Sequence, residues 1–131
     1  MRRLLPTLLP TLLVMSAAVR SVSATEPGVD FFERKIRPVL VENCYQCHSD
    51  EALNAGKLQG KLLLDSRDAI RRGGDSGPAV VPGDPNSSIL ISAIRHDSLE
   101  MPPKSRLPQE VIDKFVKWVA MGAPDPRDGE I

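Results

Sequence analysis

The chain has 131 residues, with 17 basic and 17 acidic side chains and five aromatic ones. That length accommodates one domain, and the balanced charge excludes a protein that binds nucleic acid through clustered lysine and arginine. Twelve prolines and nine glycines predict long loops, and a small, loop-rich domain usually needs a disulfide, a metal or a cofactor to be stable.

Residues 1–24 are typical of a signal peptide. A pair of arginines precedes the mostly apolar stretch 4–19, and Val22 and Ala24 suit the positions before a cleavage site. The alternative is a membrane anchor, but the stretch is shorter than the ~20 residues that a spanning helix needs. We therefore expect an exported domain over 25–131, periplasmic or otherwise extracytoplasmic and without a membrane span. Its formal charge is −3, since 14 basic residues remain against 17 acidic ones.

The first half of this domain is predicted to be helical, with irregular connections. Apolar side chains recur on one face from Asp30 into Cys44, and Pro38 should kink this helix or begin it anew. Residues 49–64 are rich in turns. Residues 66–72 predict a short helix that ends at a pair of glycines.

The second half alternates loops and helices. Loops 73–85 and 95–107 flank a helix expected over 89–94, which a serine just before it would cap. The last helix is predicted from Pro108 to Gly122. Strand signals are weak throughout. The fold class is therefore predicted to be all-α, with three to five helices and long glycine- and proline-rich loops.

The segment Cys44-Tyr45-Gln46-Cys47-His48 holds both cysteines of the chain. Its spacing, C-x-x-C-H, is the signature of covalent c-type haem attachment. Two thiols one helical turn apart can join the two vinyl groups on one side of a porphyrin, and the adjacent imidazole then faces the iron. The motif predicts one covalent haem c, with Cys44 and Cys47 as thioethers and His48 as the proximal iron ligand. Such a group would also supply the missing core.

Three other interpretations compete with haem. The two cysteines could form a disulfide, or they could be a thioredoxin-like redox pair, although that pair normally follows a strand in a βαβ unit. A structural zinc site needs four ligands, and only His96 remains as an obvious partner. The specificity of the five-residue motif favours haem.

The opposite side of the iron has three candidate ligands. Met101 lies in a loop that Pro102 and Pro103 stiffen, so we favour it as the distal iron ligand. Met121 fits core packing at a helix end, and His96 fits a solvent-side loop. We expect an apolar cavity between His48 and Met101.

The surroundings of the haem can also be predicted. Leu90, Ile94, Pro78 and Pro82 are expected to line its pocket. The second ring nitrogen of His48 needs an acceptor, which we expect to be a backbone carbonyl within 77–82.

Several segments of the chain, in order, resemble the planctomycete-type cytochrome c domain. They are residues 31–40, Cys44–His48, Leu64–Arg67, Gly73–Ala79, Val81–Pro85, Met101–Pro103 and Trp118–Pro124. The resemblance covers nearly all of residues 30–126. It implies an all-α cytochrome c fold in which Met101 occupies the distal position. That module usually opens longer exported proteins, so we expect either a free-standing carrier or a split part of a larger assembly.

Three functions are compatible with these features. The first is one-electron transfer with an unidentified redox partner protein. Four basic residues near the expected haem loops are candidates for steering that partner, although a solvated charged surface is the simpler interpretation of each one: Lys57, Lys61, Lys104 and Arg106. The second is a peroxidase-like haem enzyme, for which only His96 offers a distal acid–base group. The third is a haem-stabilised docking module. We expect the first, a carrier rather than an enzyme.

Overall fold

A computed structural model describes residues 26–127. The described elements are α1 (Pro27–Phe31), η1 (Phe32–Ile36), α2 (Arg37–Asn43), α3 (Asp50–Asn54), α4 (Arg67–Arg72), η2 (Pro85–Ser87), α5 (Ile89–Arg95) and α6 (Gln109–Ala120). No strand occurs among residues 26–127, where Gly74 and Gly77 form an isolated bridge. The all-α prediction is thus confirmed. The predicted signal peptide, 1–24, lies outside the described residues.

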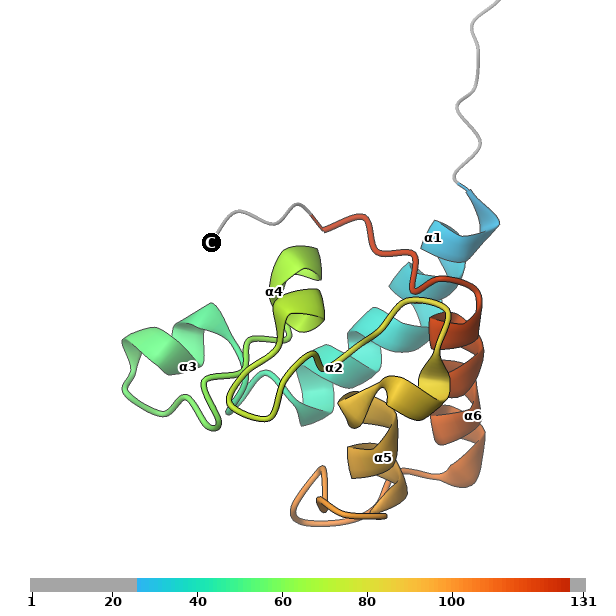
Figure 1. The fold of residues 1–131 in the computed structure, drawn as a ribbon. Helices are drawn as coiled ribbons and strands as arrows, with labels where there is room; N and C mark the ends of the chain where they lie inside the picture. The colour runs from blue at the N-terminus through green and yellow to red at the C-terminus, as the bar shows by residue number, and fades with distance from the viewer. Residues whose placement is uncertain (1–25, 128–131) are drawn as a thin grey trace, which may run out of the picture.

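The first three elements form one helical rod (Figure 1). Its middle part, η1, is a turn of π-helix, in which the Arg37 N–H bonds to the Phe32 carbonyl. Pro38 has no N–H to give to the carbonyl four residues earlier, and its ring crowds that carbonyl, so the turn before it widens. Pro38 then sits in the first turn of α2, which confirms the predicted restart. The rod begins at Pro27, earlier than predicted.

The core lies where α6 crosses the rod. One face of α6 is buried, and the rings of Trp118 and Phe32 lie 5.5 Å apart, with Phe115 edge-on to Trp118 at 6.2 Å. Helix α5 packs on α6 from the other side. Aromatic pairs in this geometry add ~0.5–1.5 kcal/mol beyond the burial of their area. This cluster therefore fixes the rod relative to α5 and α6.

Two short helices are set by serine caps. The Ser66 hydroxyl accepts from the Ala69 N–H at 3.1 Å and begins α4, as predicted. The Ser49 hydroxyl does the same for Ala52, also at 3.1 Å, and begins α3. Helix α3 lies in the segment 49–64, which we predicted to be rich in turns. We did not predict this helix, because five residues are too few to show a helical apolar pattern.

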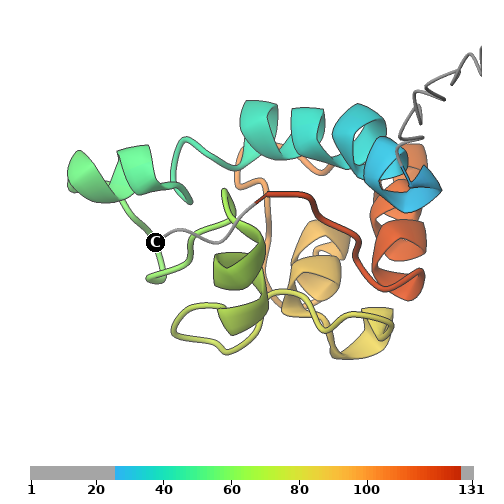
Figure 2. The same ribbon diagram turned by 90° about the horizontal axis from the view of Figure 1, so that it is seen from above.

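After α6 the chain continues as an extended strap, residues 121–127. The Trp118 indole N–H donates to the Pro124 carbonyl at 2.9 Å, and Arg71 of α4 donates to the Ala123 carbonyl at 3.2 Å. The two ribbon views show the strap passing between the rod and α4 (Figure 2). It therefore connects the α6 end of the molecule with the end at which α2 stops.

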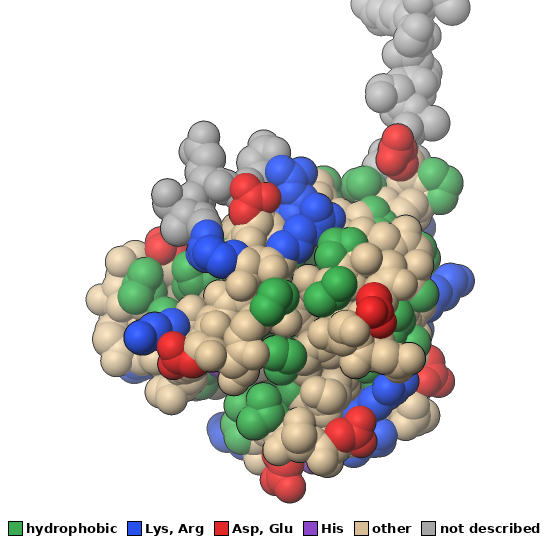
Figure 3. Space-filling model, in the orientation of Figure 1, with side chains coloured by type: hydrophobic (Ala, Val, Ile, Leu, Met, Phe, Trp, Pro, Cys, Tyr) green, Lys and Arg blue, Asp and Glu red, His purple; other side chains and the backbone are tan. Residues whose placement is uncertain are grey.

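The surface is mixed in charge. Acidic and basic side chains are scattered over the face seen in Figure 3, in keeping with 17 of each in the chain. Within residues 26–127, none of the helices has the length and apolar character that crossing a membrane would require.

Candidate functional site

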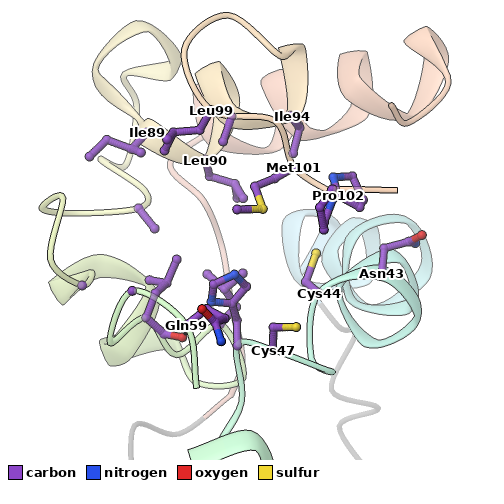
Figure 4. A pocket seen from close by; sticks show the side chains of 18 of the residues that line it. Asn43, Cys44, Cys47, Gln59, Ile89, Leu90, Ile94, Leu99, Met101 and Pro102 are labelled. Carbon is purple, nitrogen blue, oxygen red and sulfur yellow. Dashed lines mark hydrogen bonds between the residues drawn. The ribbon is translucent and has the colours of Figure 1, made fainter. Parts of the chain in front are cut away.

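A cavity of about 790 Å³ opens between the end of α2 and helix α5 (Figure 4). This volume lies within the ~300–1,000 Å³ of typical small-molecule and cofactor pockets. Its lining comes from five segments: 42–48, 59–64, 74–79, 89–94 and 99–105. The predicted residues Cys44, Cys47, His48, Met101, Leu90 and Ile94 all line it.

One wall of the cavity is the turn that follows α2. The Cys44 N–H closes the helix onto the Leu40 carbonyl at 2.9 Å, and the His48 N–H bonds to the Cys44 carbonyl at 3.0 Å. The turn therefore brings Cys44, Cys47 and His48 to one side of the cavity. Both cysteines are free thiols. Burial raises the pKa of the Cys44 thiol to about 11, so this group is neutral at physiological pH.

His48 is held by the segment that returns from α3. Its Nδ1 lies 3.2 Å from the Leu62 carbonyl, and its own carbonyl accepts from the Leu64 N–H at 2.9 Å. With the proton on Nδ1, His48 donates to Leu62 and leaves Nε2 with a free lone pair, which is the state that binds a metal. Our prediction of an acceptor within 77–82 was wrong, because the segment paired with His48 is 62–64.

Gly74 allows residues 74–75 to pack closely against residues 60–62, the segment that carries the Leu62 carbonyl. A Cβ on Gly74 would lie 2.2 Å from the Gly60 carbonyl oxygen and 3.0 Å from the Leu62 nitrogen. The Asp75 N–H also bonds to the Gly60 carbonyl at 2.9 Å. Only glycine at position 74 lets the two loops meet, and the contact supports the segment that carries the Leu62 carbonyl.

The opposite wall comes from α5 and from the loop after it. Met101 and Leu90 point into the cavity, with Ile94 and Leu99 beside them (Figure 4). The Met101 N–H bonds to the Ala93 carbonyl at 3.1 Å, which holds the methionine loop against α5. The thioether of Met101 thus faces the cavity from the side opposite the Cys44–His48 turn. We call this turn the attachment turn, after the role that its motif predicts.

Two predicted pocket residues lie elsewhere. Pro78 and Pro82 do not line the cavity, whereas Gly77 and Ala79 do. Both prolines are exposed to solvent instead. Ser88, whose hydroxyl bonds to the Val81 N–H at 2.9 Å, holds the end of this loop toward α5.

The two other ligand candidates are also placed differently from our predictions. His96 does not line the cavity, and it is half-buried rather than at the solvent side. It ends α5 in the left-handed conformation, φ 61°, and its Nε2 is buried without a hydrogen-bond partner. Met121 is 42% exposed, because it follows the end of α6 and lies outside that helix's buried face.

Sequence reasoning missed several residues of this region. Leu62, Leu64 and Gln59 line the cavity from a segment that shows no motif. The run of three leucines at 62–64 was the available signal, since a short apolar run in a turn-rich segment marks burial. Arg127 was missed as well, because nothing in the sequence distinguishes a buried arginine from an exposed one.

The donors at this cavity fit a c-type haem. Two thiols and an imidazole with a free Nε2 line one wall, a thioether faces them, and Leu90 and Ile94 make the wall between apolar. Zinc requires about four clustered ligands. Within residues 26–127, no three His, Cys, Asp or Glu side chains lie close enough together to bind a metal ion.

Comparison with known families agrees with this geometry. Residues 44–105 match the family described as Planctomycete cytochrome C, a span that includes both cysteines, His48 and Met101. A cytochrome c domain implies haem as its cofactor, so the class that fold and site define is a haem-binding c-type cytochrome. The match supports a planctomycete-type cytochrome c domain over residues 44–105. Comparisons with curated proteins and with solved structures give no match.

Proposed function

We propose that this protein is an exported electron carrier that binds one haem covalently through Cys44 and Cys47. The observation that carries the proposal is that Cys44, Cys47, His48 and Met101 all line one cavity. His48 and Met101 are the axial ligands in this proposal. Haem bound in this way supplies a one-electron redox centre.

The chain's own residues favour transfer over reactivity. His48, oriented by Leu62, and Met101, held through the Ala93 carbonyl, take the two opposite positions, and His/Met ligation raises the reduction potential. A peroxidase-like site needs an acid–base group on the distal side, and His96 does not line the cavity. A carrier with an unidentified redox partner is therefore the better-supported function.

The partner would approach where the cavity opens. Of the four basic residues considered for steering, Lys104 lines the cavity, whereas Lys57, Lys61 and Arg106 do not. Lys104 is thus the proposed steering charge, and it acts on the association rate rather than on the affinity.

Expression with and without a haem-attachment system tests this function. We expect haem that stays bound under denaturing conditions, a low-spin six-coordinate spectrum, and reversible one-electron reduction. The double variant Cys44→Ser, Cys47→Ser is the matched control, because it keeps His48 and Met101 and loses only the two attachment points.

Two results would contradict the proposal. Haem that is absent, or that denaturation removes from the unaltered protein as readily as from the double variant, would exclude covalent attachment. A high-spin spectrum that Met101→Ala leaves unchanged would exclude the ligand pair and favour an enzyme.

A further inference from the structure

The guanidinium of Arg127 is buried behind the attachment turn. Arg127 is 8% exposed and pairs with Asp125, itself 6% exposed, through bonds of 2.6–3.2 Å. Burial lowers the pKa of Arg127, but the bonds and charge of Asp125 outweigh it, so the pKa lies above its usual value. Arg127 lies at the end of the strap, and Tyr45, its partner in the turn, lies 82 residues earlier in the chain.

This one side chain contacts three other parts of the molecule. Its Nη1 donates to the Tyr45 hydroxyl at 2.7 Å and to the Leu64 carbonyl at 2.6 Å. The guanidinium carbon also lies 4.9 Å from the ring centre of Phe32, the aromatic residue of η1 that packs on Trp118. Arginine suits this role because its planar fork donates several bonds in fixed directions.

Two of these contacts converge on His48. Tyr45 lies within the Cys44–His48 turn, so the hydrogen bond from Arg127 to its hydroxyl ties the turn to the strap. Leu64, whose carbonyl Arg127 binds, gives its N–H to the His48 carbonyl at 2.9 Å. Two residues earlier, the Leu62 carbonyl accepts from the imidazole. The segment that orients His48 is therefore fixed by Arg127 on its far side.

We propose that Arg127 is a positioning residue for the proximal histidine. It clamps the turn through Tyr45 and the acceptor segment through Leu64, and so sets the strength of the Leu62–His48 hydrogen bond. That bond makes the imidazole a more basic ligand, which stabilises ferric iron. The strap is thereby part of the haem site, although none of its residues lines the cavity. This role rests on the proposed function only where haem is concerned.

The variant Arg127→Lys tests the clamp while keeping the charge beside Asp125. Lysine cannot donate to Asp125, Tyr45 and Leu64 at once, so the Leu62–His48 bond should weaken and the ferric state should lose stability. We expect the reduction potential to rise by about 28 mV, which corresponds to about a threefold change in the one-electron redox equilibrium. If Arg127 acted through its charge alone, Arg127→Lys would have the same reduction potential as the unaltered protein.

A second measurement does not need haem. In the full chain expressed without the attachment system, the Leu64 amide should exchange its hydrogen about tenfold faster in Arg127→Lys than in the unaltered protein. Tyr45→Phe, which removes one contact of the clamp, should show a smaller change in the same direction. Both variants keep the aromatic core, so both should fold.

Arg71→Met is the matched control. Arg71 also holds the strap, by donating to the Ala123 carbonyl, and this hydrogen bond involves neither the turn nor residues 62–64. Equal potentials and equal Leu64 exchange in Arg127→Lys and Arg71→Met would overturn the inference, with the proposed function untouched. Failure of haem attachment in every variant would instead overturn the proposed function, and the exchange measurement would still decide on the clamp.

Discussion

The two walls of the cavity differ in how firmly they are held. The attachment turn is tied to α2, to residues 62–64 and, through Arg127, to the strap and the rod. The methionine loop opposite has the Met101–Ala93 bond of 3.1 Å and an Arg106–Arg95 bond of 3.3 Å, and its Leu99 is 42% exposed. The first wall is thus preorganised, whereas the second can adjust.

This difference suits a covalently attached cofactor. A turn that is already fixed holds the two thiols at the spacing that attachment to two vinyl groups requires. A thioether ligand, by contrast, needs only to reach the iron once the haem is in place. The fold therefore concentrates its buried polar contacts on the wall where we propose that haem is attached.

The largest expected effect comes from breaking the firm wall with His48→Ala. This change removes the proximal ligand and the donor to Leu62 together. We expect haem to remain covalently attached but to lose the six-coordinate, low-spin spectrum completely. Absorption spectra of the reduced protein measure this, with added imidazole as the check, because it should restore the low-spin form. A low-spin spectrum in His48→Ala without imidazole would contradict the assignment.

A smaller effect is expected from Met101→Ala in the adjustable wall. The haem should stay attached, and the reduction potential should fall by about 59 mV or more, a tenfold change in the redox equilibrium, since a methionine ligand raises the potential. Met121→Ala is the matched control, because Met121 is 42% exposed and does not line the cavity. If both variants shifted the potential equally, Met101 would not be the ligand.

The sequence predicted local features better than contacts between distant segments. Helix α6 and the attachment turn follow from local rules, namely an apolar face and a fixed motif, so both could be recognised without a structure. The acceptor for His48 could not, because Leu62 reaches it through a turn whose course depends on Gly60 and Gly74 meeting. Such contacts depend on tertiary packing, which spacing alone does not record.

The burial of Arg127 is the clearest case of this limit. Nothing in the sequence distinguishes it from an exposed arginine, and only the fold shows Tyr45 and the Leu64 carbonyl beside it. An arginine is rarely buried unless it is paired, and Asp125 two residues earlier supplies the pair. The contacts with Tyr45 and Leu64, which lie 82 and 63 residues away, have no local signature.

The smallest expected effect concerns the thiol at the edge of the firm wall. Burial raises the pKa of Cys44 from 9.0 to about 11, so in the full chain without haem its thiolate should be about a hundredfold scarcer near pH 8 than in the unfolded chain. Alkylation of Cys44 in a Cys47→Ser variant should therefore be slow at pH 8 and should accelerate as the pH rises toward about 11. The same shift in the pKa of Cys44 also makes the stability of the fold depend on pH. The folded state holds the Cys44 proton more tightly than the unfolded state, so this contribution to stability is complete below pH 9 and is lost as the pH rises from 9 to about 11. Alkylation rates that equal those of the urea-unfolded chain at every pH would show that the wall is open before haem binds, and the contrast between the two walls would then disappear.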